Sequence, residues 1–116
     1  FPVAEEMQLG ISNGLALNNC VPVSLFPRWN FLLLATNQLV NHLDKFHVMS
    51  QGKFKTKVII RTSVGSQRPL HPQHQHIGDF TEVVMRVLRL NGQVSDALAV
   101  SVDRGVFGQF GALVHL

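Results

Sequence analysis

The alternation of short apolar segments with longer segments of helical periodicity constrains the fold of this chain more than any other feature. Two short segments, residues 21–26 and 57–62, are rich in apolar and β-branched residues, as is typical of buried parallel strands. Helical spacing is found from about Pro2 to Asn18 and at residues 30–49 and 80–90, and a further strand is expected at 97–102. That order predicts an α/β fold, with helices covering a mainly parallel sheet.

The first helix is expected to begin directly after Pro2, where Glu5 and Glu6 would lie in the positive field of its first turn. Asn18 and Asn19 are expected to end it, because Asn tolerates the left-handed conformation found at helix ends. An α/β unit normally opens on a strand, whereas this chain opens on a helix. We therefore expect a truncated domain that lacks its first strand.

Composition limits the class of protein. The chain has 116 residues, 46% hydrophobic and 15% charged, which predicts a single domain over residues 1–116 and argues against intrinsic disorder. Its longest unbroken apolar run, residues 31–35, is far shorter than the roughly 20 residues of a membrane span, so no membrane association is expected.

Cys20 is the only cysteine and cannot form an internal disulfide. The first ten residues lack the basic region of a secretory signal, which favours a cytoplasmic location.

The charge pattern does not indicate a nucleic-acid partner. Ten Lys and Arg residues face seven Asp and Glu residues, for a net charge of +3. The densest basic cluster, formed by Lys53, Lys55 and Lys57, has two interpretations: a solvated strand edge that discourages pairing, or a phosphate contact. We favour the solvated edge. The low charge density favours association with a protein partner.

Residues 63–79 form a long segment without periodicity, and such loops are often functional in compact domains. The segment contains His71, His74 and His76. They have three interpretations: solvated loop residues, groups for acid–base or substrate-polarising chemistry, or ligands of a transition metal. Because their spacing matches no standard zinc pattern, we predict no metal site.

Taken alone, Glu5 and Glu6 are most simply helix-start carboxylates, and Trp29 and Phe31 are most simply core aromatics. The sequence contains no Walker loop, no G-x-G-x-x-G fingerprint and no G-x-S-x-G elbow. A nucleotide kinase or a serine hydrolase therefore has no support.

A series of short motifs nevertheless occurs in a specific order along residues 2–90. They are P-V-A-E at residues 2–5 with glycines five and nine residues after that Glu, P-V at 22–23, F-P-R-W-N-F at 26–31, N-Q-L-V-N at 37–41, M-S-Q-G at 49–52, V-I-I-R-T-S-V-G at 58–65, and the histidine-containing stretch 72–80. Together they resemble the pyrimidine-binding domain of thiamine diphosphate-dependent enzymes, in particular the beta subunits of 2-oxoacid dehydrogenases and transketolase-like proteins. Residues 91–116 form a tail that does not share the resemblance.

The resemblance implies a three-layer α/β sandwich of the thiamine diphosphate-binding type, and it assigns roles to particular residues. Glu5 matches the catalytic carboxylate that hydrogen-bonds the aminopyrimidine ring of the cofactor and favours its imino tautomer. Phe31 matches the aromatic residue that stacks on this ring, and Trp29 is the neighbour that could replace it. His76 or His74 matches the active-site histidine, and the residues that follow favour His76. Leu25 departs from the family, which often has a polar or acidic residue there.

The same resemblance implies that this chain could hold only the pyrimidine end of thiamine diphosphate. The Gly-Asp-Gly motif and later Asn with which the family binds magnesium and diphosphate are absent from the sequence, so a partner subunit would have to supply them. The alternative is a truncated, non-catalytic relic that folds and self-associates, and a weaker one is a ligand- or metal-binding module built on the histidine loop. We expect a homodimer, formed through the Gly10 and Gly14 helix face or the turn at residues 29–34.

Overall fold

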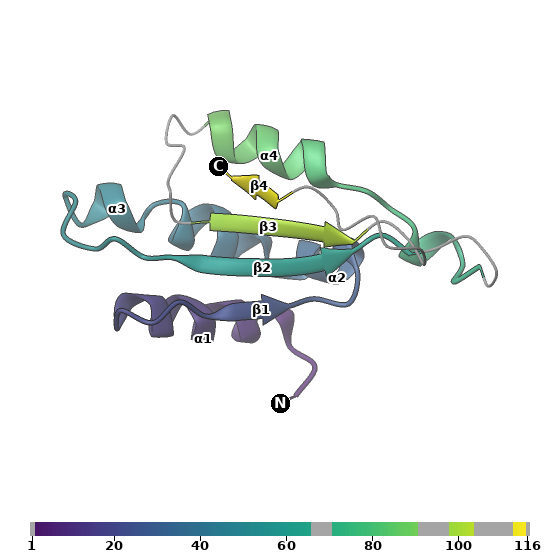
Figure 1. Cartoon of the computed structure of the whole chain (residues 1–116), viewed down its shortest axis with the longest axis horizontal. Helices are drawn as coiled ribbons and strands as arrows, with labels where there is room; N and C mark the ends of the chain where they lie inside the picture. The colour runs from purple at the N-terminus through teal and green to yellow at the C-terminus, as the bar shows by residue number, and fades with distance from the viewer. Residues whose placement is uncertain (1, 66–70, 91–97, 104–112, 116) are drawn as a thin grey trace.

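A four-stranded sheet organises the computed structural model, which describes residues 2–65, 71–90, 98–103 and 113–115 (Figure 1). The strands are β1 (Val23–Leu25), β2 (Val58–Ser63), β3 (Leu98–Asp103) and β4 (Leu113–His115), in the order β1-β2-β3-β4. The pairs β1–β2 and β2–β3 are parallel, whereas β3–β4 is antiparallel. The α/β prediction is confirmed. The strand expected at 97–102 is present as β3, whereas β4, further along the tail, was not predicted.

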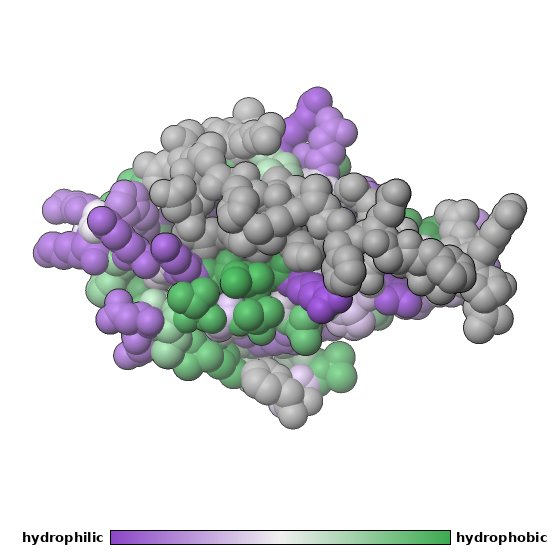
Figure 2. All heavy atoms as spheres, in the orientation of Figure 1, coloured by the Kyte–Doolittle hydropathy of each residue, from purple (hydrophilic) through white to green (hydrophobic). Residues whose placement is uncertain are grey.

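The two faces of the β1–β2 pair differ in exposure. Val23 pairs with Ile59 and Leu25 pairs with Arg61, so side chains from both strands alternate in step. One face is buried and consists of Ser24, Val58, Ile60 and Thr62. On the opposite face Val23, Leu25 and Arg61 are exposed. Figure 2, in the orientation of Figure 1, shows apolar side chains gathered over the region of β1 and β2.

Helix α1 (Glu5–Leu17) follows the predicted limits. Glu5 and Glu6 lie in its first turn, and the chain leaves it through Asn18 and then Asn19, which has a positive φ of 63°. Its inward side carries Leu9, Ser12, Asn13 and Ala16. Its outward side is also apolar, because Met7, Ile11 and Leu15 are all exposed.

The segment predicted as one helix over 30–49 is helical but changes its hydrogen-bond pattern along its length. It consists of α2 (Trp29–Leu32), a 3-10 turn η1 (Leu33–Ala35), a π-helical segment η2 (Gln38–Leu43) and α3 (Phe46–Met49). In η2 the amide of Asp44 donates to the carbonyl oxygen of Leu39, five residues earlier, at 3.1 Å. Four side chains of this segment are buried in the core: Leu32, Ala35, Leu39 and Leu43.

One apolar core joins the helices to a single face of the sheet. Buried residues of α1, of the 29–43 segment and of α4 (Thr81–Leu90) form one cluster with Val58 and Ile60 of β2. Figure 1 shows α2 behind the strands. Within the described residues the helices therefore form one layer, and the second helical layer of the predicted sandwich is not seen there. No described helix is long and apolar enough to span a membrane.

Candidate functional site

The start of α1 lies beside the carboxyl end of β1, and a side chain fixes this arrangement. The Gln8 amide donates to Ser24 Oγ at 3.0 Å and to the carbonyl oxygen of Leu25 at 2.8 Å. Glu5, three residues before Gln8, is half-buried at the first position of the helix. The neighbouring Glu6 accepts a hydrogen bond from the Asn37 amide at 2.7 Å. Because ligands of open α/β sheets bind beyond the carboxyl ends of the strands, Glu5 stands at the expected edge.

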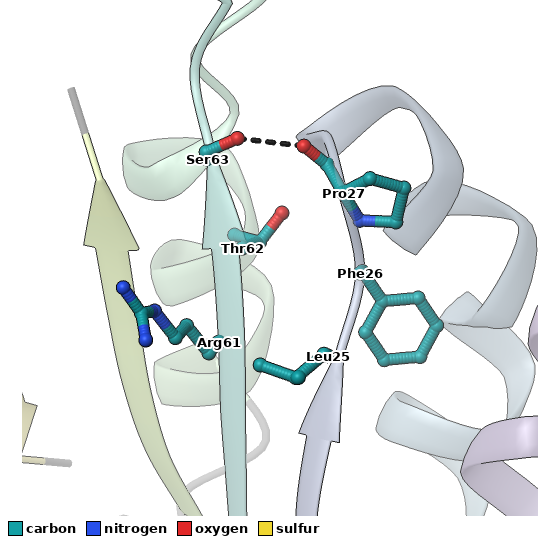
Figure 3. Close-up of a pocket in the computed structure, with 6 residues that line it drawn as sticks. All are labelled: Leu25, Phe26, Pro27, Arg61, Thr62 and Ser63. Atoms are coloured by element: carbon teal, nitrogen blue, oxygen red, sulfur yellow. Dashed lines mark hydrogen bonds between the residues drawn. The ribbon is translucent and has the colours of Figure 1, made fainter. Parts of the chain in front are cut away.

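A polar network closes the ends of β1 and β2. Ser63 Oγ donates to the carbonyl oxygen of Pro27 at 2.6 Å, as drawn in Figure 3. Arg28 Nη1 donates to the same carbonyl at 2.7 Å and to Ser63 Oγ at 3.0 Å. An open pocket of about 300 Å³ adjoins this network and is lined by Leu25, Phe26, Pro27, Arg61, Thr62 and Ser63. Its one charged lining residue is Arg61, so its charge is positive.

Phe31 and His76 are brought together although 45 positions separate them in the sequence. Phe31 belongs to α2, and His76 ends the short 3-10 turn η3 (His74–His76), which contacts α2. The two ring centroids lie 5.6 Å apart with the planes tilted by 44°. Both residues are half-buried, so each keeps part of its surface accessible.

His74 occupies a different environment within the same turn. It is exposed, and its ring lies edge-on to that of His71 with a centroid distance of 5.5 Å. Among the residues that the structure describes, no group of three or more potential metal ligands converges. The geometry therefore separates the two histidines: His76 faces Phe31, whereas His74 faces His71.

Trp29 lies in the core. Its side chain is only 1% exposed, and its indole Nε1 has no hydrogen-bond partner among the described residues. The role that the resemblance gives to an aromatic ring therefore fits the accessible Phe31 better than it fits Trp29. The same burial removes Trp29 from the predicted self-association surface at 29–34, of which Leu33 and Leu34 are exposed.

Three residues of the site had no predicted role. Arg28 and Ser63 form the network at the strand ends, and Gly65 donates its amide to the carbonyl oxygen of His76 at 2.9 Å. All three lie within the motifs at 26–31 and 58–65. The signal that could have identified Gly65 is its position two residues after a buried strand, where a close backbone approach favours glycine.

Comparison with known proteins adds relatives for part of the chain. No family model matches. Over 73 residues, 63% of this chain, it is 36% identical to the "Pyruvate dehydrogenase E1 component subunit beta" of Chaetosphaeridium globosum, of which it covers 22%. Over 73 residues it is 37% identical to the chloroplastic subunit beta-4 of Oryza sativa subsp. japonica, covering 18% of it. Over 80 residues, 69% of this chain, it is 31% identical to the mitochondrial subunit beta of Ascaris suum, covering 22% of it.

The chain thus spans about a fifth of the length of these curated relatives. The names of these relatives agree with the family that the motifs along residues 2–90 resemble. The chain is a partial homologue of the beta subunits of the pyruvate dehydrogenase E1 component.

Proposed function

We propose that this chain is the pyrimidine-binding half of a thiamine diphosphate-dependent enzyme of the 2-oxoacid dehydrogenase type. The observation that carries the proposal is the Phe31–His76 pair, with ring centroids 5.6 Å apart, contributed by α2 and η3. Glu5 at the start of α1 supplies the third group. We also propose that the complete domain is a three-layer sandwich. A partner subunit would bind the diphosphate and the magnesium ion.

The residues present fit the pyrimidine end of the cofactor. When bound, thiamine diphosphate supplies a carbanion nucleophile that adds to a substrate carbonyl. The Glu5 carboxylate would accept a hydrogen bond from the protonated ring nitrogen, and the accessible side of Phe31 would pack on the ring. The His76 imidazole would hold or move a proton at the substrate oxygen. His76 is preferred to His74 for this role because it faces Phe31.

Binding of the cofactor by the isolated chain is the first test. We expect weak or undetectable binding, because the diphosphate and magnesium ligands, which supply much of the affinity, are absent from this sequence. Titration calorimetry with thiamine diphosphate, with and without magnesium, measures this directly. Micromolar, magnesium-dependent binding by the chain alone would contradict the requirement for a partner.

Substitution of Glu5 tests the catalytic assignment. In a complex with a diphosphate-binding subunit that restores activity, Glu5→Gln should abolish exchange of the cofactor's thiazolium proton, because the amide cannot stabilise the protonated ring. The free energy of unfolding should change by less than about 0.5 kcal/mol, as for most surface substitutions. Glu6→Gln is the matched control, since its retained Oε1 can still accept from Asn37. Full exchange in Glu5→Gln would remove Glu5 from the mechanism.

A second candidate function is a non-catalytic, self-associating relic of such a domain. The observation that favours it is the apolar outer side of α1, where Met7, Ile11 and Leu15 are 42%, 44% and 45% exposed. A water-facing helix surface is normally polar, so this side is expected to be covered in an assembly. A homodimer would cover it without any catalytic partner.

A further inference from the structure

We propose that Gly65 is a positioning residue for His76. Its amide bonds the His76 carbonyl oxygen, and the absence of a Cβ leaves the space that the His76 backbone occupies at the end of β2. This placement sets the imidazole against Phe31. The catalytic meaning of this placement rests on the proposed function. The placement itself can be tested on the chain alone, without cofactor or partner.

The contact connects the histidine turn to the end of β2, which pairs with a strand on each side. Gly65 is buried and follows β2 by two residues, and the intervening Val64 packs against the core. The Gly65 amide donates to the carbonyl oxygen of His76 at 2.9 Å. A buried backbone bond of this kind is costly to break because both groups would lose their partners away from water. The position of His76 is therefore set by the end of β2.

Space, and not backbone conformation, explains why this residue is a glycine. A Cβ at position 65 would lie 2.2 Å from the carbonyl oxygen of His76 and 2.8 Å from Cγ of Pro72. The carbonyl is backbone and cannot rotate aside as a side chain can. Any larger residue would force the segment containing His76 away from β2. Gly14 is different, because a Cβ there would meet nothing within 4 Å.

The other end of the turn is held in a strained conformation, which indicates that the surroundings fix it. Gln73, immediately before η3, has a positive φ of 75°, a region that non-glycine residues seldom adopt. Its amide donates to Nδ1 of His71 at 3.0 Å, and its carbonyl oxygen accepts from the His76 amide at 3.1 Å. Such strain persists only where neighbouring contacts over-determine the backbone. The Gly65 bond is one such contact at the far end of the turn.

Nuclear magnetic resonance on the isolated chain tests the placement. In the wild type we expect a through-hydrogen-bond scalar coupling between the Gly65 nitrogen and the His76 carbonyl carbon. We also expect a nuclear Overhauser effect between the Phe31 and His76 rings. Gly65→Ala should lose both signals and shift the His76 imidazole resonances. The effect between His42 and Phe46, whose centroids lie 6.4 Å apart, should persist and exclude a general loss of structure.

Gly14→Ala is the matched control and should retain every signal. A folded Gly65→Ala chain that keeps the Phe31–His76 effect would overturn the proposal. If Gly65→Ala does not fold, the wild-type coupling decides: a coupling that is absent overturns the proposal, and one that is present supports it. This test can fail or succeed independently of the proposed function. A normal rate of thiazolium proton exchange in Glu5→Gln would refute the catalytic role of Glu5, but it would leave the Gly65–His76 contact intact.

Discussion

Two adjacent residues of β2, Thr62 and Ser63, differ in whether their hydroxyl groups have hydrogen-bond partners. Ser63 Oγ donates to one carbonyl oxygen and accepts from a guanidinium, whereas the buried Thr62 Oγ1 has no partner among the described residues. An unsatisfied buried hydroxyl opposes folding, and a satisfied one is close to neutral or mildly favourable. The same chemical group therefore has a different energetic sign at neighbouring positions.

Replacement of the Thr62 hydroxyl should accordingly stabilise the chain. Thr62→Val keeps the shape of the side chain and removes the unpartnered oxygen, so we expect the free energy of unfolding to rise by about 1 kcal/mol. Ser63→Ala on the same strand should lower it by about 1 kcal/mol, since two hydrogen bonds are lost. Urea unfolding of both variants measures the difference. A Thr62→Val chain that is less stable than wild type would show that the hydroxyl is satisfied.

At this scale the resemblance placed Phe31 before Trp29 and His76 before His74, but residue identity alone gave no physical reason for that order. Trp29 and Phe31 are both aromatic and two positions apart, and their identities do not reveal which one is buried. The path of α2 over the sheet determines that Trp29 is 1% exposed while Phe31 remains accessible. The separation of His76 from His74 likewise depends on the contact with α2, which lies far away in the sequence.

A polar contact joins α1 to the π-helical segment η2. Asn13 is buried in α1, and its amide donates to the carbonyl oxygen of Gln38 at 3.1 Å and to its Oε1 at 3.3 Å. The Gln38 side chain passes close to Gly10, where a Cβ would lie 3.6 Å away. Gly10, which was predicted to belong to the self-association face, thus borders a side chain of its own chain.

Loss of this joint should destabilise the fold. Asn13→Ala removes two bonds to Gln38, but it also removes the buried Asn13 Oδ1, which has no partner among the described residues, so we expect the free energy of unfolding to fall by about 1 kcal/mol. Asn18→Ala is the control: its amide also donates to a carbonyl, that of Gly14, but it is exposed and water can replace it. Chemical denaturation should therefore show the larger loss for Asn13→Ala. Equal losses would mean that burial of Asn13 does not matter.

Element positions were predicted more closely than element geometry. Strand β2 and helix α4 lie within one residue of the predicted limits, and α1 ends within one residue of its predicted end but begins three residues after Pro2. The 30–49 segment has helical spacing throughout, and the sequence does not reveal where the pitch changes. Contacts such as Asn13 with Gln38 accompany those changes, and they join positions 25 residues apart.

At the scale of the whole molecule, the outward apolar surfaces favour assembly. One lies on the outer side of α1, and the other on the exposed face of β1, where Val21, Val23 and Leu25 are each more than half exposed. Removing apolar area from water contributes about 25 cal/mol per Å², so a few hundred Å² correspond to several kcal/mol before association costs. The single helical layer was not foreseen, because periodicity shows which residues are apolar and not which face of a sheet they cover.

Self-association should therefore be measurable and sensitive to Gly14. We expect sedimentation equilibrium at tens of micromolar to give twice the 12.9 kDa of one chain. Gly14→Leu should weaken the dimer by preventing close approach of two α1 helices, while the monomer tolerates it because the site is open. Asn41→Leu, on another exposed helical surface, should not weaken it. A mass of one chain at these concentrations would refute the homodimer.

The bond between Gln8 and Leu25 has a consequence for aggregation. The amide of Phe26 and the carbonyl of Pro22 bond to β2, so the peptide groups of Val23 and Leu25 point away from it. That outer border is where another chain could add a strand, and the flanking side chains are apolar. The Gln8 amide occupies the Leu25 carbonyl oxygen there, so this acceptor is not available to an added strand.

We expect Gln8→Ala to remove this protection. Light scattering during mild heating should rise in Gln8→Ala at temperatures where the wild type stays clear, whereas Gln75→Ala, on the exposed η3 turn, should behave as wild type. Equal scattering from all three chains would show that the border is guarded by other means. If scattering rises only in Gln8→Ala, the side chain that aligns α1 with β1 also protects this strand edge against aggregation.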